Sequence, residues 1–155
     1  MKQRAYIETS VVSYAVGRPT RNLLIAGRQQ LTRRWWATAG ERFTLLVSPV
    51  VIRECAAGNA QRAAERLQAI EGFGSLDLGE SVVALAEKLV QYGGLPRKAA
   101  NDALHVAVAS VWRVDYLITW NCTHIANATT RRTMEQIVLA SGLPFPVICT
   151  PEELP

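Results

Sequence analysis

Apolar and polar residues alternate along the chain in a pattern that predicts strands and helices in turn. Short apolar runs between polar or turn residues predict strands, and longer stretches with apolar residues three or four positions apart predict helices. We expect strands at 4–7, 43–47, 76–78, 116–119 and 146–149. We expect helices at 9–16, 22–38, from Pro49 to Gly58, and at 60–71, 81–92, 98–112 and 131–140, with a last turn at 150–153. This order predicts an α/β fold, a three-layer α/β/α sandwich around a parallel sheet of about four or five strands.

Two of the expected helices have informative faces. The stretch 98–112 carries small residues that would let it lie close against a sheet, namely Ala99, Ala103, Val106, Ala107 and Ser110. The stretch 22–38 places Leu24, Leu31 and Trp35 on one stripe, whereas Trp36 is about 100° further round the axis. One of the two indole rings could face a partner, or the same chain could cover both.

Size and composition are those of one domain, which we expect to span residues 1–155. The 155 residues are 49% hydrophobic, which is enough for a sizeable core. The three cysteines, Cys55, Cys122 and Cys149, are odd in number and form no C-x-x-C pair, so neither a disulfide framework nor a zinc site is expected. We interpret Cys55 and Cys122 as small apolar fillers. No run approaches the roughly 18 apolar residues of a membrane span, so we expect a reducing, cytoplasmic setting.

The positive charge is concentrated in the first half of the chain. Residues 1–66 contain eleven of the seventeen basic residues and four of the thirteen acidic ones, a local charge of +7 within a total of +4. Such asymmetry suits a polyanionic partner, and arginine suits phosphate because of its planar fork of donors. The arginines could equally be the solvated faces of amphipathic helices.

Acidic side chains stand where the expected strands end. Glu8 follows the first strand, Glu54 lies in the second turn of the helix after the second strand, Asp102 lies early in the helix 98–112, and Asn121 follows the fourth strand. Since the carboxyl ends of parallel strands meet at one edge, these groups are expected to surround one point. Three packed carboxylates repel each other unless a cation holds them, and oxygen ligands favour Mg²⁺ or Mn²⁺.

Each of these residues also has a simpler interpretation. Glu8 could merely stabilise the start of the helix that follows it, and an acid such as Asp102 is ordinary in a first helical turn. Glu54 could lie on a solvated helix face. His105 is expected to share a face with Asp102, but a lone histidine among alanines is more often a hydrogen-bonded core residue than a metal ligand.

Taken together, four segments resemble PIN-domain nucleases, in particular the VapC toxins of type II toxin–antitoxin systems. They are 6–10 (YIETS), 48–54, 101–105 (NDALH) and 116–121 (YLITWN), and the resemblance covers nearly the whole chain in order. It implies a metal-dependent endoribonuclease with Mg²⁺ or Mn²⁺ as cofactor. The chain differs from the family by having Glu8 where aspartate is usual and Asn121 where an acid is common, which leaves one metal site expected and a second one open.

The resemblance also implies roles for individual residues. Glu8, Glu54 and Asp102 would be metal ligands and, with Asn121 near the fourth position, the catalytic set. Supporting or phosphate-side polar groups would be Thr9, Ser10 and Thr119, and we expect Arg18 and Arg21 to hold RNA phosphates. The implied partners are RNA, a second copy in a homodimer, and a small antitoxin protein.

Two other functions stay open at this point. The chain could be a catalytically weakened PIN fold that binds RNA or a protein without cutting. It could also be a receiver-like domain that is phosphorylated on an acid, although that chemistry wants an aspartate after the first strand and Glu8 stands there.

Overall fold

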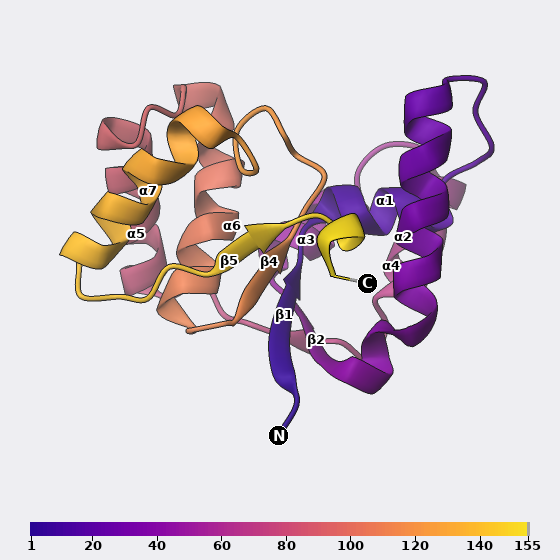
Figure 1. The fold of residues 1–155 in the computed structure, drawn as a ribbon, viewed down its shortest axis with the longest axis horizontal. Coiled ribbons are helices and arrows are strands. Elements are labelled where there is room, and N and C mark those ends of the chain that lie inside the picture. Colours follow the sequence, from indigo (N-terminus) through magenta and orange to yellow (C-terminus); the bar gives the residue numbers. More distant parts are fainter. Residues whose placement is uncertain (155) are drawn as a thin grey trace.

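A central sheet of five parallel strands organises the molecule (Figure 1). The computed structural model describes residues 1–154. The strands are β1 (Gln3–Ile7), β2 (Phe43–Val47), β3 (Gly74–Ser75), β4 (Tyr116–Ile118) and β5 (Val147–Cys149), and they lie in the order β3-β2-β1-β4-β5. β1, which precedes Glu8, and β4, which precedes Asn121, are therefore neighbours in the sheet.

Helices cover both faces of the sheet, with α1 to α4 on one side and α5 to α7 on the other (Figure 1). Their bounds are α1 (Thr9–Val16), α2 (Leu23–Arg42), α3 (Pro49–Cys55), α4 (Ala60–Ala69), α5 (Glu80–Tyr92), α6 (Ala100–Val111) and α7 (Ala128–Ala140), with 3₁₀ turns η1 (Arg97–Ala99) and η2 (Pro151–Glu153). The predicted three-layer α/β architecture is thus confirmed. Within residues 1–154, no helix combines the length and the apolar character that a membrane crossing needs.

The small-residue face of α6 explains how this helix reaches the sheet. Ala103, Val106, Ala107 and Ser110 are all fully buried, and Ala99 nearly so, as their spacing predicts. Alanine side chains let the helix axis approach the strands closely, so polar side chains in the first turns of α6 come near the strand ends. Asp102 lies in that first turn.

Several elements differ from the sequence-based expectation, among them α3, which ends at Cys55 instead of Gly58, and α7, which begins at Ala128 instead of residue 131. The third strand lies at Gly74–Ser75 instead of 76–78, because these two residues pair with the last two residues of β2. Leu76 adds one more hydrogen bond, from its N–H to the carbonyl of Val47. The second helix runs on to Arg42 instead of stopping near residue 38, and ends only where β2 begins.

The face that α2 turns inward is also different. Leu24 is 64% exposed, so the predicted stripe with Leu31 and Trp35 is wrong at its first member. The buried residues of α2 are Gln29, Thr32, Trp35 and Ala39, because the amino-terminal turn extends beyond the body of the protein (Figure 1).

Both tryptophans of this helix pack within the chain. Trp35 is buried against Phe43, with ring centroids 6.2 Å apart. Trp36 is partly buried and stacks on Phe73 at 5.7 Å. Both rings therefore contact the same chain, on β2 and on the segment before β3 instead of on another helix.

Candidate active site

Glu8 stands at the centre of the carboxyl edge of the sheet. It is the residue after β1, it caps α1, and its own N–H donates to the carbonyl of Ile118 at the end of β4. Its side chain is only 5% exposed although it carries a carboxylate. The strand pairing therefore places a nearly buried acid beside Thr119, the first residue after β4.

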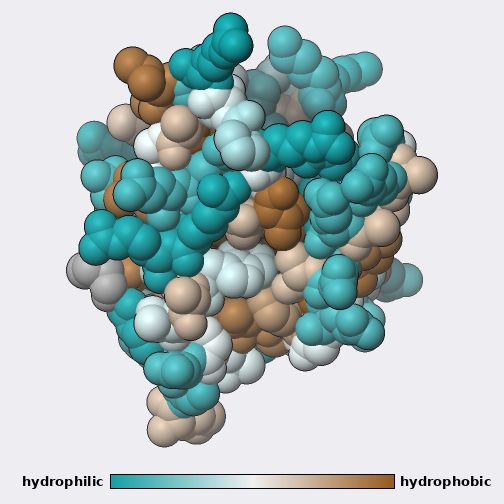
Figure 2. All heavy atoms as spheres, turned by 90° about the vertical axis from the view of Figure 1, so that its right-hand side faces the viewer, coloured by the Kyte–Doolittle hydropathy of each residue, from teal (hydrophilic) through white to brown (hydrophobic). Residues whose placement is uncertain are grey.

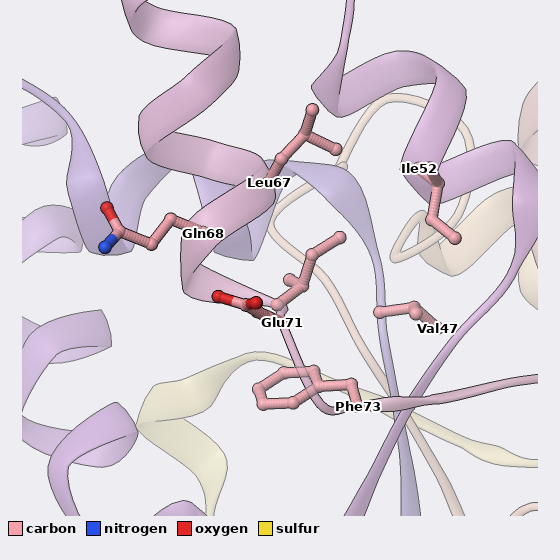
Figure 3. Close-up of a pocket in the computed structure, with 7 residues that line it drawn as sticks. Val47, Ile52, Leu67, Gln68, Glu71 and Phe73 are labelled. Atoms are coloured by element: carbon pink, nitrogen blue, oxygen red, sulfur yellow. The ribbon is translucent and has the colours of Figure 1, made fainter.

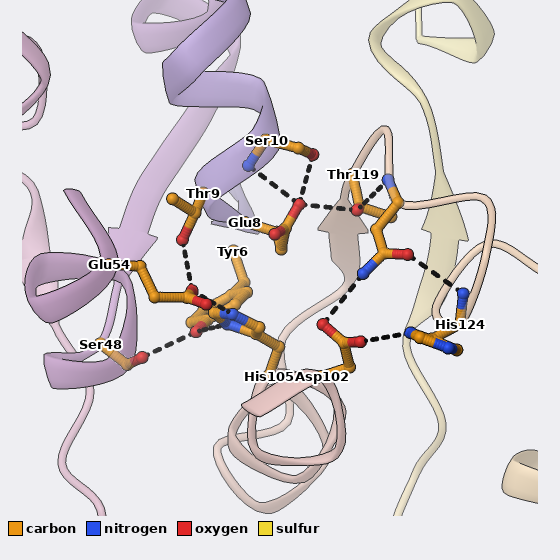
Figure 4. Close-up of polar contacts among 11 residues, drawn as sticks. Tyr6, Glu8, Thr9, Ser10, Ser48, Glu54, Asp102, His105, Thr119 and His124 are labelled. Atoms are coloured by element: carbon orange, nitrogen blue, oxygen red, sulfur yellow. Dashed lines mark hydrogen bonds and ion pairs between the residues drawn. The ribbon is translucent and has the colours of Figure 1, made fainter. Parts of the chain in front are cut away.

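Three donors converge on one oxygen of Glu8. Its Oε2 accepts from Ser10 N–H at 3.1 Å, from the Ser10 hydroxyl, and from the Thr119 hydroxyl at 2.8 Å (Figure 4). Among residues 1–154, none donates a hydrogen bond to its other oxygen, Oε1. Glu8 therefore caps the start of α1, which was its simpler interpretation. It uses only Oε2 for this and leaves Oε1 without a hydrogen-bond donor.

Glu54 reaches the same edge from α3. Its Oε1 accepts from the Thr9 hydroxyl at 2.6 Å and lies 2.7 Å from His105 Nε2. Partial burial raises the pKa of this carboxyl, but the hydrogen bond and charge of His105 and the bond from Thr9 outweigh it and hold the pKa below its ordinary value. Glu54 is thus ionised and faces the interior, so the interpretation as a solvated surface residue is wrong.

His105 is a fully buried residue between two polar partners. Its Nε2 faces Glu54, and its Nδ1 lies 2.7 Å from the hydroxyl of Tyr6, which in turn lies 2.7 Å from the hydroxyl of Ser48. Burial lowers the pKa of the imidazole, yet the bond to Glu54 and the surrounding carboxylates raise it above the ordinary value overall. The prediction of a hydrogen-bonded core histidine is confirmed.

A second cluster lies on the other side of Glu8 (Figure 4). Asp102 Oδ1 accepts from the Asn121 side-chain amide at 2.9 Å, and Oδ2 lies 2.7 Å from His124 Nδ1. Asn121 also accepts from the backbone N–H of His124 at 3.0 Å. His124 was not singled out from the sequence. Its position three residues after Asn121, in the turn that follows β4, is the signal that could have indicated it.

A metal ion would find its closest set of ligand atoms at Glu8, Glu54 and His105. One ligand atom from each lies within 4.8 Å of the others, in a search of residues 1–154. Asp102, which the sequence suggested as third ligand, points instead toward Asn121 and His124. His105 Nε2 must carry hydrogen to bond an ionised Glu54, so the oxygens without partners, Glu8 Oε1 and Glu54 Oε2, are the atoms that suit a hard cation.

Hydrogen-bonding groups of the protein itself also engage each of the three acids. We expected three packed carboxylates to need a cation to stay charged, but each has its own donors: His105 for Glu54, His124 for Asp102, and hydroxyl and amide groups for Glu8. The site can therefore form before any ion binds.

The arginines divide into two groups. Arg33 donates to the carbonyls of Ala15 and Gly17 at the end of α1, and Arg66 donates to those of Cys55 and Ala57 after α3, so these two stabilise helix ends. Part of the positive charge in the first half of the chain is therefore structural.

Arg18 and Arg21 belong to the other group. Both are exposed in the loop between α1 and α2, and neither donates a side-chain hydrogen bond within residues 1–154. Hydrophilic side chains cover much of the face on the α2 side of the molecule (Figure 2). These two arginines are free to meet a ligand.

Two hollows of the surface lie away from the residues Glu8, Glu54 and Asp102. One of about 430 Å³ lies between α3, α4, the end of β2 and the segment that links α4 to β3, and it is lined mainly by apolar side chains such as Val47, Ile52, Leu67 and Phe73 (Figure 3). A larger one of about 790 Å³ lies between α5 and α6. Glu8, Glu54 and Asp102 line neither of these two hollows.

The cysteines take no part in the site. Cys55 is a buried filler, as expected, but Cys122 is exposed in the turn after β4, so its interpretation as a filler is wrong.

Comparison with known proteins gives one structural likeness. No family model matches the chain, and no curated protein matches it. A chain of the VapBC2 complex from Rickettsia felis, solved with a DNA fragment from the VapBC2 promoter, superimposes with a TM-score of 0.59 over 96% of this chain and 98% of its own length. The fold is PIN-like. At 13% sequence identity the likeness concerns the fold and not the activity.

Proposed function

We propose that the protein is a metal-dependent endoribonuclease that hydrolyses RNA phosphodiester bonds. The observation that carries the proposal is the convergence of Glu8 and Glu54 at the carboxyl edge, each with one carboxylate oxygen engaged by donors and one left free. Preoriented carboxylates with free oxygens are what a hard divalent cation requires. The PIN-like fold supports the same activity.

In this proposal Glu8, Glu54 and Asp102 together hold Mg²⁺ or Mn²⁺. Glu8 Oε1 and Glu54 Oε2 would bind directly, and Asp102 would bind through an intervening water, since its carboxylate is held by Asn121 and His124. When bound, such an ion lowers the pKa of water and offsets the charge that develops on the phosphate.

The remaining residues serve the acids and the substrate. Ser10 and Thr119 hold Glu8, Thr9 holds Glu54, and Asn121 holds Asp102. Hydrogen bonds of this kind orient metal-binding carboxylates and are worth tenfold or more in affinity. Arg18 and Arg21 would contact RNA phosphates with little base specificity.

The test is cleavage of a single-stranded RNA with Mn²⁺, and separately with EDTA. We expect the native protein to cleave the RNA with Mn²⁺ and not with EDTA. We expect Asp102→Asn to lose this cleavage and also to lose the thermal stabilisation that Mn²⁺ gives the native protein. This variant should fold, because an asparagine amide can donate to a neutral His124 while its oxygen still accepts from Asn121. The exposed Asp77→Asn is the matched control. Full activity of Asp102→Asn would exclude the site.

One observation favours a second function, a PIN fold that binds RNA or a protein without cutting. In the pairs Glu54–His105 and Asp102–His124, each acid already has a histidine partner without an ion. The same assay separates the two functions: RNA binding in EDTA combined with no turnover in Mn²⁺ would establish the second.

We further propose that the chain is a toxin that forms a homodimer and is restrained by a small antitoxin. Support comes from the structural likeness to a chain of a VapBC2 complex. Expression of the native chain alone, beside Asp102→Asn, is the test. Growth arrest that only the native chain causes is the expected result, and equal growth of both strains would contradict it.

A further inference from the structure

A chain of hydrogen bonds runs from the core of the protein to Glu54 (Figure 4). It links the Ser48 hydroxyl to the Tyr6 hydroxyl, Tyr6 to His105 Nδ1, and His105 Nε2 to Glu54 Oε1, with 2.7 Å at each step. Its first three members are fully buried. The links join β1, the start of α3, and α6, so three separate elements hold one carboxylate.

Ser48 gives up its usual role to take part. It is the N-cap residue of α3, where a serine normally accepts from a backbone N–H of the first turn. Here the side chain makes no such bond and turns to Tyr6 instead. A capping interaction typically contributes about 1 kcal/mol to the free energy of unfolding, and Ser48 does not make this contribution.

The hydroxyl of Tyr6 is unusual for a residue inside the sheet. A phenylalanine would fill the same space without bringing a polar group into the core, where an unpaired hydroxyl is costly. The ring also packs against the imidazole of His105, with centroids 5.8 Å apart. Tyr6 therefore fixes both the position and the rotation of that imidazole.

The direction of the bonds follows from the last acceptor. An ionised Glu54 can only accept, so His105 must donate from Nε2. Tyr6 can accept from Ser48 and donate to Nδ1, or accept from Nδ1 and donate to Ser48. The chain is thus satisfied in either state of the imidazole, and it holds Glu54 Oε1 in place while Oε2 stays free.

We infer that Tyr6 and Ser48 are positioning residues of the metal site, acting on Glu54 through His105. This inference rests on the proposed metal-dependent function. Loss of a group that orients a metal-binding residue typically costs 10-fold to 100-fold in metal affinity. We expect a loss of this size from either end of the chain, although neither side chain reaches the ion.

The experiment is a calorimetric titration with Mn²⁺ of the native protein, Tyr6→Phe and Ser48→Ala. Tyr6→Phe keeps the ring, and Ser48→Ala removes no helix cap, so each variant deletes one hydroxyl of the chain. The control is Tyr116→Phe, whose hydroxyl makes only a 3.4 Å contact with Gln3. We expect the dissociation constant for Mn²⁺ to rise 10-fold to 100-fold in both test variants and to stay unchanged in the control.

Cleavage gives a second measurement. The Mn²⁺ concentration for half-maximal cleavage should rise by the same factor in Tyr6→Phe, while the rate at saturating Mn²⁺ returns close to the native one. Lower thermal stability with unchanged Mn²⁺ affinity would mean a purely structural role and would overturn the inference. If the native protein itself binds no Mn²⁺, the proposed function fails, and the inference with it.

Discussion

His105 donates its Nε2–H to Glu54 across 2.7 Å, although 51 residues separate the two in the chain. The imidazole is fully buried and Glu54 is partly exposed, so the bond joins the core to the open edge of the sheet. Because the bond holds only one oxygen of Glu54, it orients the carboxylate without closing the site.

This pair should make stability depend on pH in a defined window. The pKa of Glu54 is lowered, so its stabilising contribution is present above the ordinary value of 4.5 and is lost as the pH falls through the lowered pKa. The pKa of His105 is raised, so its contribution is present below 6.5 and is lost as the pH rises through the raised pKa. The pair is most stabilising between pH 4.5 and 6.5.

Thermal unfolding in EDTA from pH 4 to 9 is the measurement. We expect the melting temperature of the native protein to exceed that of Glu54→Gln by the largest margin near pH 6. This difference in melting temperature should become smaller as the pH rises. A difference that stays constant from pH 6 to 9 would show that the imidazole is not held in its charged form by Glu54.

Thr119→Val should destabilise the metal-free protein by about 1 to 3 kcal/mol. The hydroxyl of Thr119 donates to Glu8 in a buried hydrogen bond and accepts from the backbone N–H of Asn121 at 2.9 Å in a partly buried one. Urea unfolding in EDTA measures the loss. Thr44→Val on β2, where the threonine is exposed, is the control and should change stability by no more than about 0.5 kcal/mol.

Removing Arg18 and Arg21 together should weaken RNA binding in a salt-dependent way. Each arginine that contacts a phosphate releases counterions, so the slope of log affinity against log salt should fall by about 1 to 2 in the double alanine variant. Fluorescence anisotropy with labelled single-stranded RNA in EDTA measures binding without cleavage. Arg132→Ala, an exposed position on α7, is the control. An unchanged slope in the double variant would show that Arg18 and Arg21 do not contact the RNA phosphates.

The regular elements were predictable where local pattern and local caps agree. The bounds of α1 and β2 match the expectation, and the predicted last turn forms at Pro151–Glu153, with a capping box between Thr150 and Glu153. The prediction failed where pairing or exposure is set by distant segments. β3 is defined by its contact with β2, and Leu24 is exposed together with Leu23 in the first turn of α2.

The amino-acid sequence alone determined that Glu8, Glu54 and Asp102 would stand at the carboxyl edge of a parallel sheet, because alternating strands and helices bring all strand ends to one side. Only the tertiary structure decided which group each carboxylate faces. His105 lies 99 residues from Tyr6 and Asp102 lies 22 from His124, and a hydrogen bond forms only when packing brings such atoms to within about 3 Å. That placement depends on the position of α6 along the strands, which the spacing of its small residues does not specify.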